Sequence, residues 1–153
     1  MTSQAFDVQP ISSRTADSLR TLGGTVVTAD VSPGFPCRQC LRDAEVGEEL
    51  ILVSHDPFAV DSPYRSASPI FLHAHRCELE FRDDELPEQL TRRQLNVRSF
   101  DDAAMMVDAM AIDGSELAAT IETMFQDPTS SFLHVHNAPR GCWAVTIGRG
   151  RKR

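Results

Sequence analysis

The sequence contains no long hydrophobic run. None of its 153 residues falls in a stretch that approaches the ~18 consecutive apolar residues of a transmembrane helix. The first residues, MTSQAFDVQPISSR, lack the charged segment and following apolar segment that are typical of a secretion signal. We therefore expect a cytoplasmic protein without a membrane partner. Its four cysteines would then be reduced thiols and not a disulfide framework.

Basic charge is also scarce, with 15 lysines and arginines against 22 acidic residues and a net charge of −7. A nucleic-acid-binding domain is usually basic, so we expect no nucleic-acid partner. The exception is the final stretch GRGRKR, whose last four residues, 150–153, are expected to form a solvated basic tail.

Common nucleotide-binding and catalytic motifs are absent as well. The sequence has no phosphate-binding loop, no GxGxxG and no GxSxG. Nothing in it therefore favours ATP binding, NAD binding or serine-hydrolase chemistry.

The length and the 41% apolar content favour one globular domain, and no linker divides the chain. Residues 1–24 form a poorly defined N-terminal segment, in which FDVQPI could be an edge strand and SSRTADSLR a short helical turn. Residues 25–149 are expected to form a single α+β domain.

Segments rich in β-branched residues or with alternating polarity predict strands within this domain. They are 25–31, 48–55, 70–81, 96–101, 103–112, 131–138 and 142–149. The main helix is predicted at about 114–127, where apolar residues recur at helical spacing before Pro128. One or two short helices complete the fold, one of them at 86–93. Strands and helices do not alternate regularly, which favours a mainly antiparallel sheet.

Four of the five histidines lie in two similar five-residue segments, FLHAH at 71–75 and FLHVH at 132–136. Alternate side chains of a strand share a face, so His73, His75 and Cys77 would lie together, and so would His134 and His136. If the two strands are neighbours, four imidazoles meet on one face. Imidazole and thiolate are zinc ligands. We therefore predict a divalent metal site, with zinc favoured, that uses His134 and His136 and is completed by His73, His75 or Cys77.

Several alternatives remain open. The histidine strands could line a metal-free pocket for a small ligand, or a protein-interaction surface. The pair Cys37 and Cys40 could be half of a metal site with His73 and His75, or a redox-active dithiol. Cys142 with His134 or His136 could act as a nucleophile and base. Whether the protein is an enzyme stays open.

Four segments together resemble the bacterial family catalogued as domain of unknown function 1203. They are PGFPCRQCLRDAEVGEELIL (33–52), SPYRSASPIFLHA (62–74), VRSFDDAAMMVDA (97–109) and FLHVHNAPRGCWAV (132–145). The resemblance implies a compact α+β domain in a bacterial cytoplasm, and it implies no particular activity or cofactor. The best-matched group is His134, His136, Asn137, Arg140 and Cys142. Arg140 could hold an anionic substrate, and we expect Asn137, Arg140 and Cys142 to bind a ligand.

Overall fold

The computed structural model describes residues 6–79 and 81–150, so residues 1–5 and residues 151–153 of the predicted basic tail lie outside it. The elements are β1 (Phe6–Gln9), α1 (Ser13–Leu22), β2 (Thr25–Thr28), β3 (Glu49–His55), β4 (Ser68–His73), α2 (Glu88–Thr91), β5 (Gln94–Phe100), β6 (Met106–Asp113), η1 (Gly114–Glu116), α3 (Leu117–Phe125), β7 (Phe132–Asn137) and β8 (Trp143–Arg149). All strand pairs are antiparallel. The α+β class, with one main helix and short additional ones, is confirmed.

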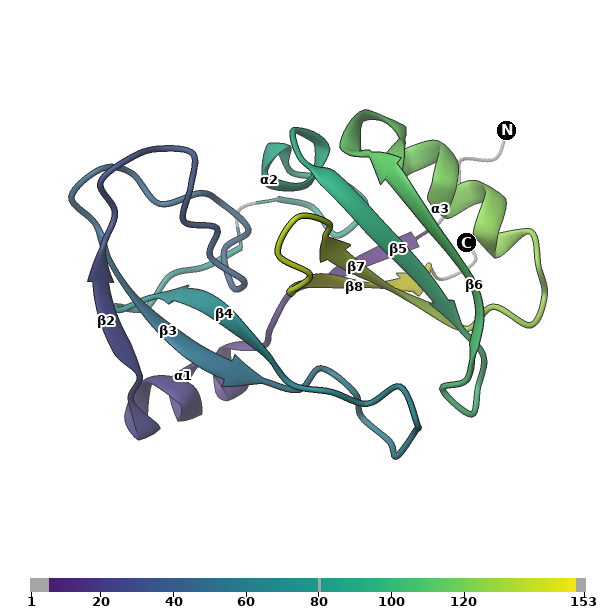
Figure 1. The fold of residues 1–153 in the computed structure, drawn as a ribbon, viewed down its shortest axis with the longest axis horizontal. Helices are drawn as coiled ribbons and strands as arrows, with labels where there is room; N and C mark the ends of the chain where they lie inside the picture. The colour runs from purple at the N-terminus through teal and green to yellow at the C-terminus, as the bar shows by residue number, and fades with distance from the viewer. Residues whose placement is uncertain (1–5, 80, 151–153) are drawn as a thin grey trace.

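The strands form two sheets that lie side by side (Figure 1). One has five strands in the order β1-β8-β7-β5-β6, and the other has three in the order β2-β3-β4. The long loop of residues 56–67 separates β4 from β3 (Figure 1). The turn of residues 36–43, which holds Cys37 and Cys40 and is called the cysteine-containing turn, lies between β2 and β3. β1 is an edge strand paired with β8, and it connects directly to α1 beneath the smaller sheet.

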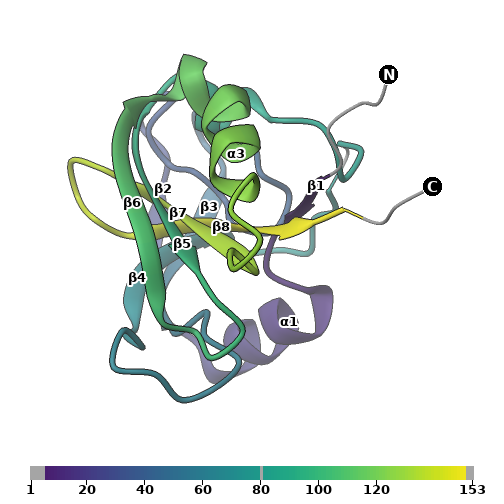
Figure 2. The ribbon, with the colours of Figure 1, turned by 90° about the vertical axis from the view of Figure 1, so that its right-hand side faces the viewer.

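Helix α3 covers one face of the five-stranded sheet (Figure 2). The chain enters it through η1, where Asp113 and Glu116 form a capping box. Ile121 on the helix and Leu133, Val135 and Val97 on the strands belong to one buried apolar cluster. Burial of this face stabilises the larger sheet. No helix in residues 6–79 or 81–150 combines the length and apolar character needed to cross a membrane.

A second apolar cluster joins the smaller sheet to α1 and to the larger sheet. It contains Ala16 of α1, Ile51 of β3, Leu72 of β4 and Trp143 of β8, together with Cys37 and Cys40. The cysteine-containing turn is therefore part of the packed interior between the sheets.

Strand β4 ends at His73, although the alternating pattern predicts a strand over 70–81. Its partner β3 begins at Glu49, and the pairing ends with Leu50 opposite His73. One further backbone hydrogen bond joins the two strands' ends, from the N–H of Ala74 to the carbonyl of Glu49. The chain then leaves the sheet because it has no partner strand. The alternation therefore does not continue to residues 75 and 77.

We expect Leu72→Ala to destabilise the fold by about 2–5 kcal/mol, because the Leu72 side chain is 0% exposed and a cavity would remain. Chemical denaturation measures the change. Leu22→Ala is the control, since Leu22 is 82% exposed and its truncation should cost less than about 0.5 kcal/mol. Equal effects of the two substitutions would contradict the packing described for β4.

Candidate functional site

Four potential metal ligands meet at one end of the smaller sheet: Cys37, Cys40, His73 and Cys77. Their ligand atoms all lie within 4.8 Å of one another. Cys37 and Cys40 come from the turn after β2, His73 ends β4, and Cys77 belongs to the loop that follows. All three thiols are free cysteines. These four residues, the metal-ligand cluster, could hold a metal ion.

Two separations within the cluster agree with tetrahedral coordination. The Sγ atoms of Cys37 and Cys77 are 3.7 Å apart, and Cys40 Sγ lies 3.5 Å from His73 Nδ1. A regular zinc tetrahedron with Zn–S bonds of about 2.3 Å and Zn–N bonds of about 2.0–2.1 Å has edges of ~3.8 Å and ~3.6 Å between these atom types. The two pairs share no atom, so they are opposite edges of the same tetrahedron.

Backbone hydrogen bonds fix the cysteine-containing turn against β4. Isolated bridges pair Pro36 with Asp43 and Cys37 with Phe71. The N–H groups of Gln39 and His73 each donate to Cys37 Sγ at 3.4 Å. Two N–H donors on one sulfur favour its thiolate form, which is the form that binds metal.

Polar side chains surround the cluster and orient its ligands. Glu48 Oε1 lies 3.0 Å from His73 Nε2, so the ring can direct Nδ1 toward the three sulfur atoms. Arg20 donates from Nε to the His73 carbonyl at 2.9 Å and from Nη2 to Gln39 Oε1 at 2.6 Å. The same Nη2 lies 3.8 Å from Cys77 Sγ. Carboxylate contacts of this kind set the tautomer and orientation of ligating histidines in metal sites.

Contacts within the cluster shift the pKa values of its thiols and of its imidazole. Hydrogen bonds from Cys40 and Cys77 lower the pKa of Cys37 well below the usual range of a thiol, whereas the bond to Cys37 raises the pKa of Cys40. Hydrogen bonds to Cys37 and Cys77 raise the pKa of His73 to about 11. These shifts favour the thiolate of Cys37 and the protonated ring of His73, and a divalent cation bound to the cluster would displace the ring proton.

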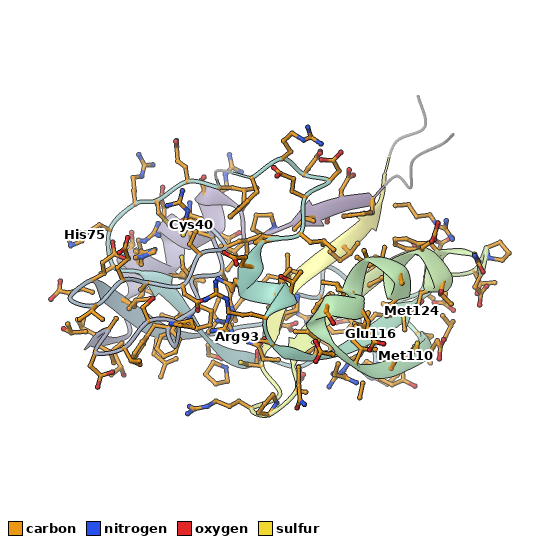
Figure 3. The ribbon with its side chains drawn as sticks, turned by 90° about the horizontal axis from the view of Figure 1, so that it is seen from above. Cys40, His75, Arg93, Met110, Glu116 and Met124 are labelled. Carbon is orange, nitrogen blue, oxygen red and sulfur yellow. The ribbon has the colours of Figure 1, made fainter. Side chains whose placement is uncertain are left out.

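His73 and Cys77 of the predicted metal set are therefore brought together, but His75 is not. The side chain of His75 is 85% exposed, and its nearest charged partner is Glu49 at 3.8 Å. Figure 3 shows His75 at the outer edge of the molecule and Cys40 further inside. Because β4 ends at His73, the following residues turn away, and the loop instead returns Cys77 to the cluster.

His134 and His136 lie on β7 in the other sheet, so the two histidine pairs do not share a sheet face. His134 is 1% exposed, and its ring contacts those of Phe58, Phe100 and Phe132 at centroid distances of 4.8–5.3 Å. His136 Nδ1 lies 2.9 Å from the Gly141 carbonyl. The condition for a four-imidazole site, neighbouring strands, is not met.

Burial lowers the pKa of both β7 histidines. It brings the pKa of His134 to about 3, helped by the nearby His136 and Arg98, and that of His136 to about 4. Both rings are therefore neutral at pH 7. The aromatic contacts and the neutral state are those of core side chains.

The predicted ligand-binding residues Asn137, Arg140 and Cys142 line one cavity of about 670 Å³. It lies at the hairpin between β7 and β8, where the two sheets approach each other. Arg38, from the cysteine-containing turn, also lines it and donates from Nη2 to Cys142 Sγ at 3.0 Å. Asn137 Oδ1 is buried and has no hydrogen-bond partner among the residues that the structure describes.

The thioredoxin-like arrangement is not found at Cys37 and Cys40. No helix begins in residues 31–48, where a thioredoxin-like dithiol would sit at a helix N-terminus. The sequence raised these two cysteines as half of a metal site with His73 and His75, and the structure places His73 and Cys77 beside them while His75 is exposed. The combination of Cys37-x-x-Cys40 with His73-x-x-x-Cys77 is the signal that identifies the four residues together.

We expect the β7 histidines to make stability depend on pH. Their folded pKa values lie below the unfolded value of about 6.5, so this contribution is present above pH 6.5 and is lost as pH falls toward 4. His134→Leu should remove about 2 kcal/mol of the loss in unfolding free energy between pH 7 and pH 5. Denaturant unfolding in matched buffers tests this, with exposed His75→Gln as the control. An unchanged pH slope in His134→Leu would contradict it.

Comparison with known families gives one result. Neither the curated proteins nor the solved structures contain a match to the chain. A family described as protein of unknown function (DUF1203) matches residues 34–149, a range that includes all four members of the metal-ligand cluster and the whole β7–β8 hairpin. The chain belongs to the DUF1203 family.

Proposed function

We propose that the protein binds one zinc ion through Cys37, Cys40, His73 and Cys77. The observation that carries the proposal is the agreement of the Cys37–Cys77 and Cys40–His73 separations, 3.7 and 3.5 Å, with the opposite edges of a zinc tetrahedron. Three sulfurs and one imidazole nitrogen are soft or borderline donors, which favour zinc over magnesium or calcium.

The number of ligands supports a structural centre. Catalytic zinc sites usually have three protein ligands and leave the fourth position to water, whereas structural sites have four. Here four side chains are available, and Cys37 and Cys40 are buried in the apolar cluster between the sheets. We therefore propose that the ion holds the cysteine-containing turn, the end of β4 and the Cys77 loop in one arrangement.

Protein purified without an affinity tag should contain about one zinc ion per chain by elemental analysis. Cys77→Ser should lower the zinc content at least about tenfold after dialysis, because it removes one of four ligands. Cobalt(II) in place of zinc should give thiolate charge-transfer absorption that Cys77→Ser weakens.

Cys142→Ser is the matched control, because Cys142 is a free cysteine outside the four-residue cluster. It should keep the zinc content and the cobalt spectrum. Metal that stays well below one ion per chain after incubation with zinc would overturn the proposal. So would equal losses in the Cys77 and Cys142 variants.

Glu48→Gln should weaken zinc binding by about 10–100-fold, the usual effect of losing a carboxylate that orients a ligating histidine. Glu49→Gln is a close control, since the Glu49 carboxylate lies 3.8 Å from the exposed His75, which is not among the four cluster residues. Competition with a chromogenic chelator measures both affinities. Equal affinities of the two variants would show that Glu48 does not orient His73.

A further inference from the structure

The lining of the cavity beside the β7–β8 hairpin combines apolar and cationic side chains. Phe35, Phe71 and Leu52 are among the apolar ones. The rings of Phe35 and Phe71 lie 5.3 Å apart at an angle of 57°. Arg38, Arg93 and Arg140 supply positive charge to the lining, which contains no acidic residue within the described part of the chain. At about 670 Å³ it falls within the size range of small-molecule sites.

Among the residues that the structure describes, no carboxylate pairs with two of the three arginines, Arg38 and Arg140. Arg93 is paired with Asp43 at 2.6 Å. Arg140 is exposed, and it makes no salt bridge within the described part of the chain. The cavity is thus positive on a protein whose net charge is −7.

Arg38 is the more unusual of the two, because its side chain is only 1% exposed. Its guanidinium donates to the carbonyls of Trp143 at 2.9 Å and Pro36 at 2.6 Å, and to Cys142 Sγ at 3.0 Å. These three acceptors hold the group rigidly, but two of them are neutral carbonyls. A buried cation without a carboxylate partner favours an anion nearby.

We propose that this cavity binds a small organic acid, with the carboxylate at the Arg38–Arg140 side and an apolar body against Phe35 and Phe71. The exposed fork of Arg140 can hold a carboxylate through two parallel hydrogen bonds. The fixed charge of Arg38 adds attraction from the interior, and the aromatic wall excludes water from the apolar body. This site is separate from the metal-ligand cluster.

Cys142 provides a reporter, because its thiol lines the cavity next to Arg38. Zinc-loaded full-length protein is treated with iodoacetamide, a neutral reagent, and alkylation of Cys142 is followed by mass spectrometry. Cleavage after Arg140 and Arg149 gives the peptide 141–149, in which Cys142 is the one cysteine. Benzoate, as the probe acid, should slow this alkylation at concentrations at which benzamide, acetate and inorganic phosphate do not.

Two variants test the role of charge. Arg140→Gln should weaken the protection by benzoate about threefold to fivefold, the range expected for loss of one partly exposed ion pair. Arg14→Gln removes the same charge from α1, away from the cavity, and should leave protection unchanged. In Arg140→Gln the reporter peptide is 99–149, which still contains no other cysteine.

The proposal would be overturned by no protection by benzoate, by equal protection by benzamide, or by equal weakening in the Arg140 and Arg14 variants. Protection by inorganic phosphate at the same concentration would also overturn it, because a small inorganic anion needs no apolar wall. Failure of zinc binding would appear separately, as alkylation of Cys37, Cys40 and Cys77 on other peptides. The two proposals therefore fail independently.

Discussion

The turn of residues 36–43 is the constraint on which the rest of the structure depends. It lies between the two sheets and contacts both of them. Its backbone pairs with β4 through the Cys37–Phe71 bridge, and the Arg38 side chain donates to the Trp143 carbonyl of β8. A buried guanidinium is costly to desolvate, and the loss is offset only while all its acceptors stay in place. The relative position of the sheets is thereby tied to one side chain.

Neighbouring residues of this turn belong to different sites. Cys37 and Cys40 face the metal-ligand cluster, whereas Arg38, between them, lines the cavity at the β7–β8 hairpin. Gln39 lies on the cluster side and accepts from Arg20. A change in the dihedral angles of the turn at one site can therefore reach groups at the other. Such a shared element is the physical basis for energetic coupling between two sites.

Much of the fold could be predicted because it depends on local patterns. Alternation and turn residues located the strands of the β7–β8 hairpin, and the apolar spacing near Ile121 located the main helix. The division into two sheets could not be predicted, since strand pairing depends on contacts distant in sequence. The end of β4 at His73 has the same origin, because it is set by where β3 begins. Extending that strand to residue 81 placed His75 in the metal site and left Cys37 and Cys40 as an alternative.

The FLHAH and FLHVH segments show why a motif does not determine the protonation of its side chains. In the first, His73 is surrounded by thiols and a carboxylate, and its pKa is raised to about 11. In the second, His134 is buried among aromatic rings, and this burial, with smaller effects of His136 and Arg98, lowers its pKa to about 3. Both residues follow Phe-Leu on a strand. The difference arises largely from the segments packed against them: the cysteine-containing turn against β4, and the ring of Phe58, from the 56–67 loop, against β7. The pKa of each histidine is thus set by tertiary contacts, and the repeated FLHxH segment does not specify them.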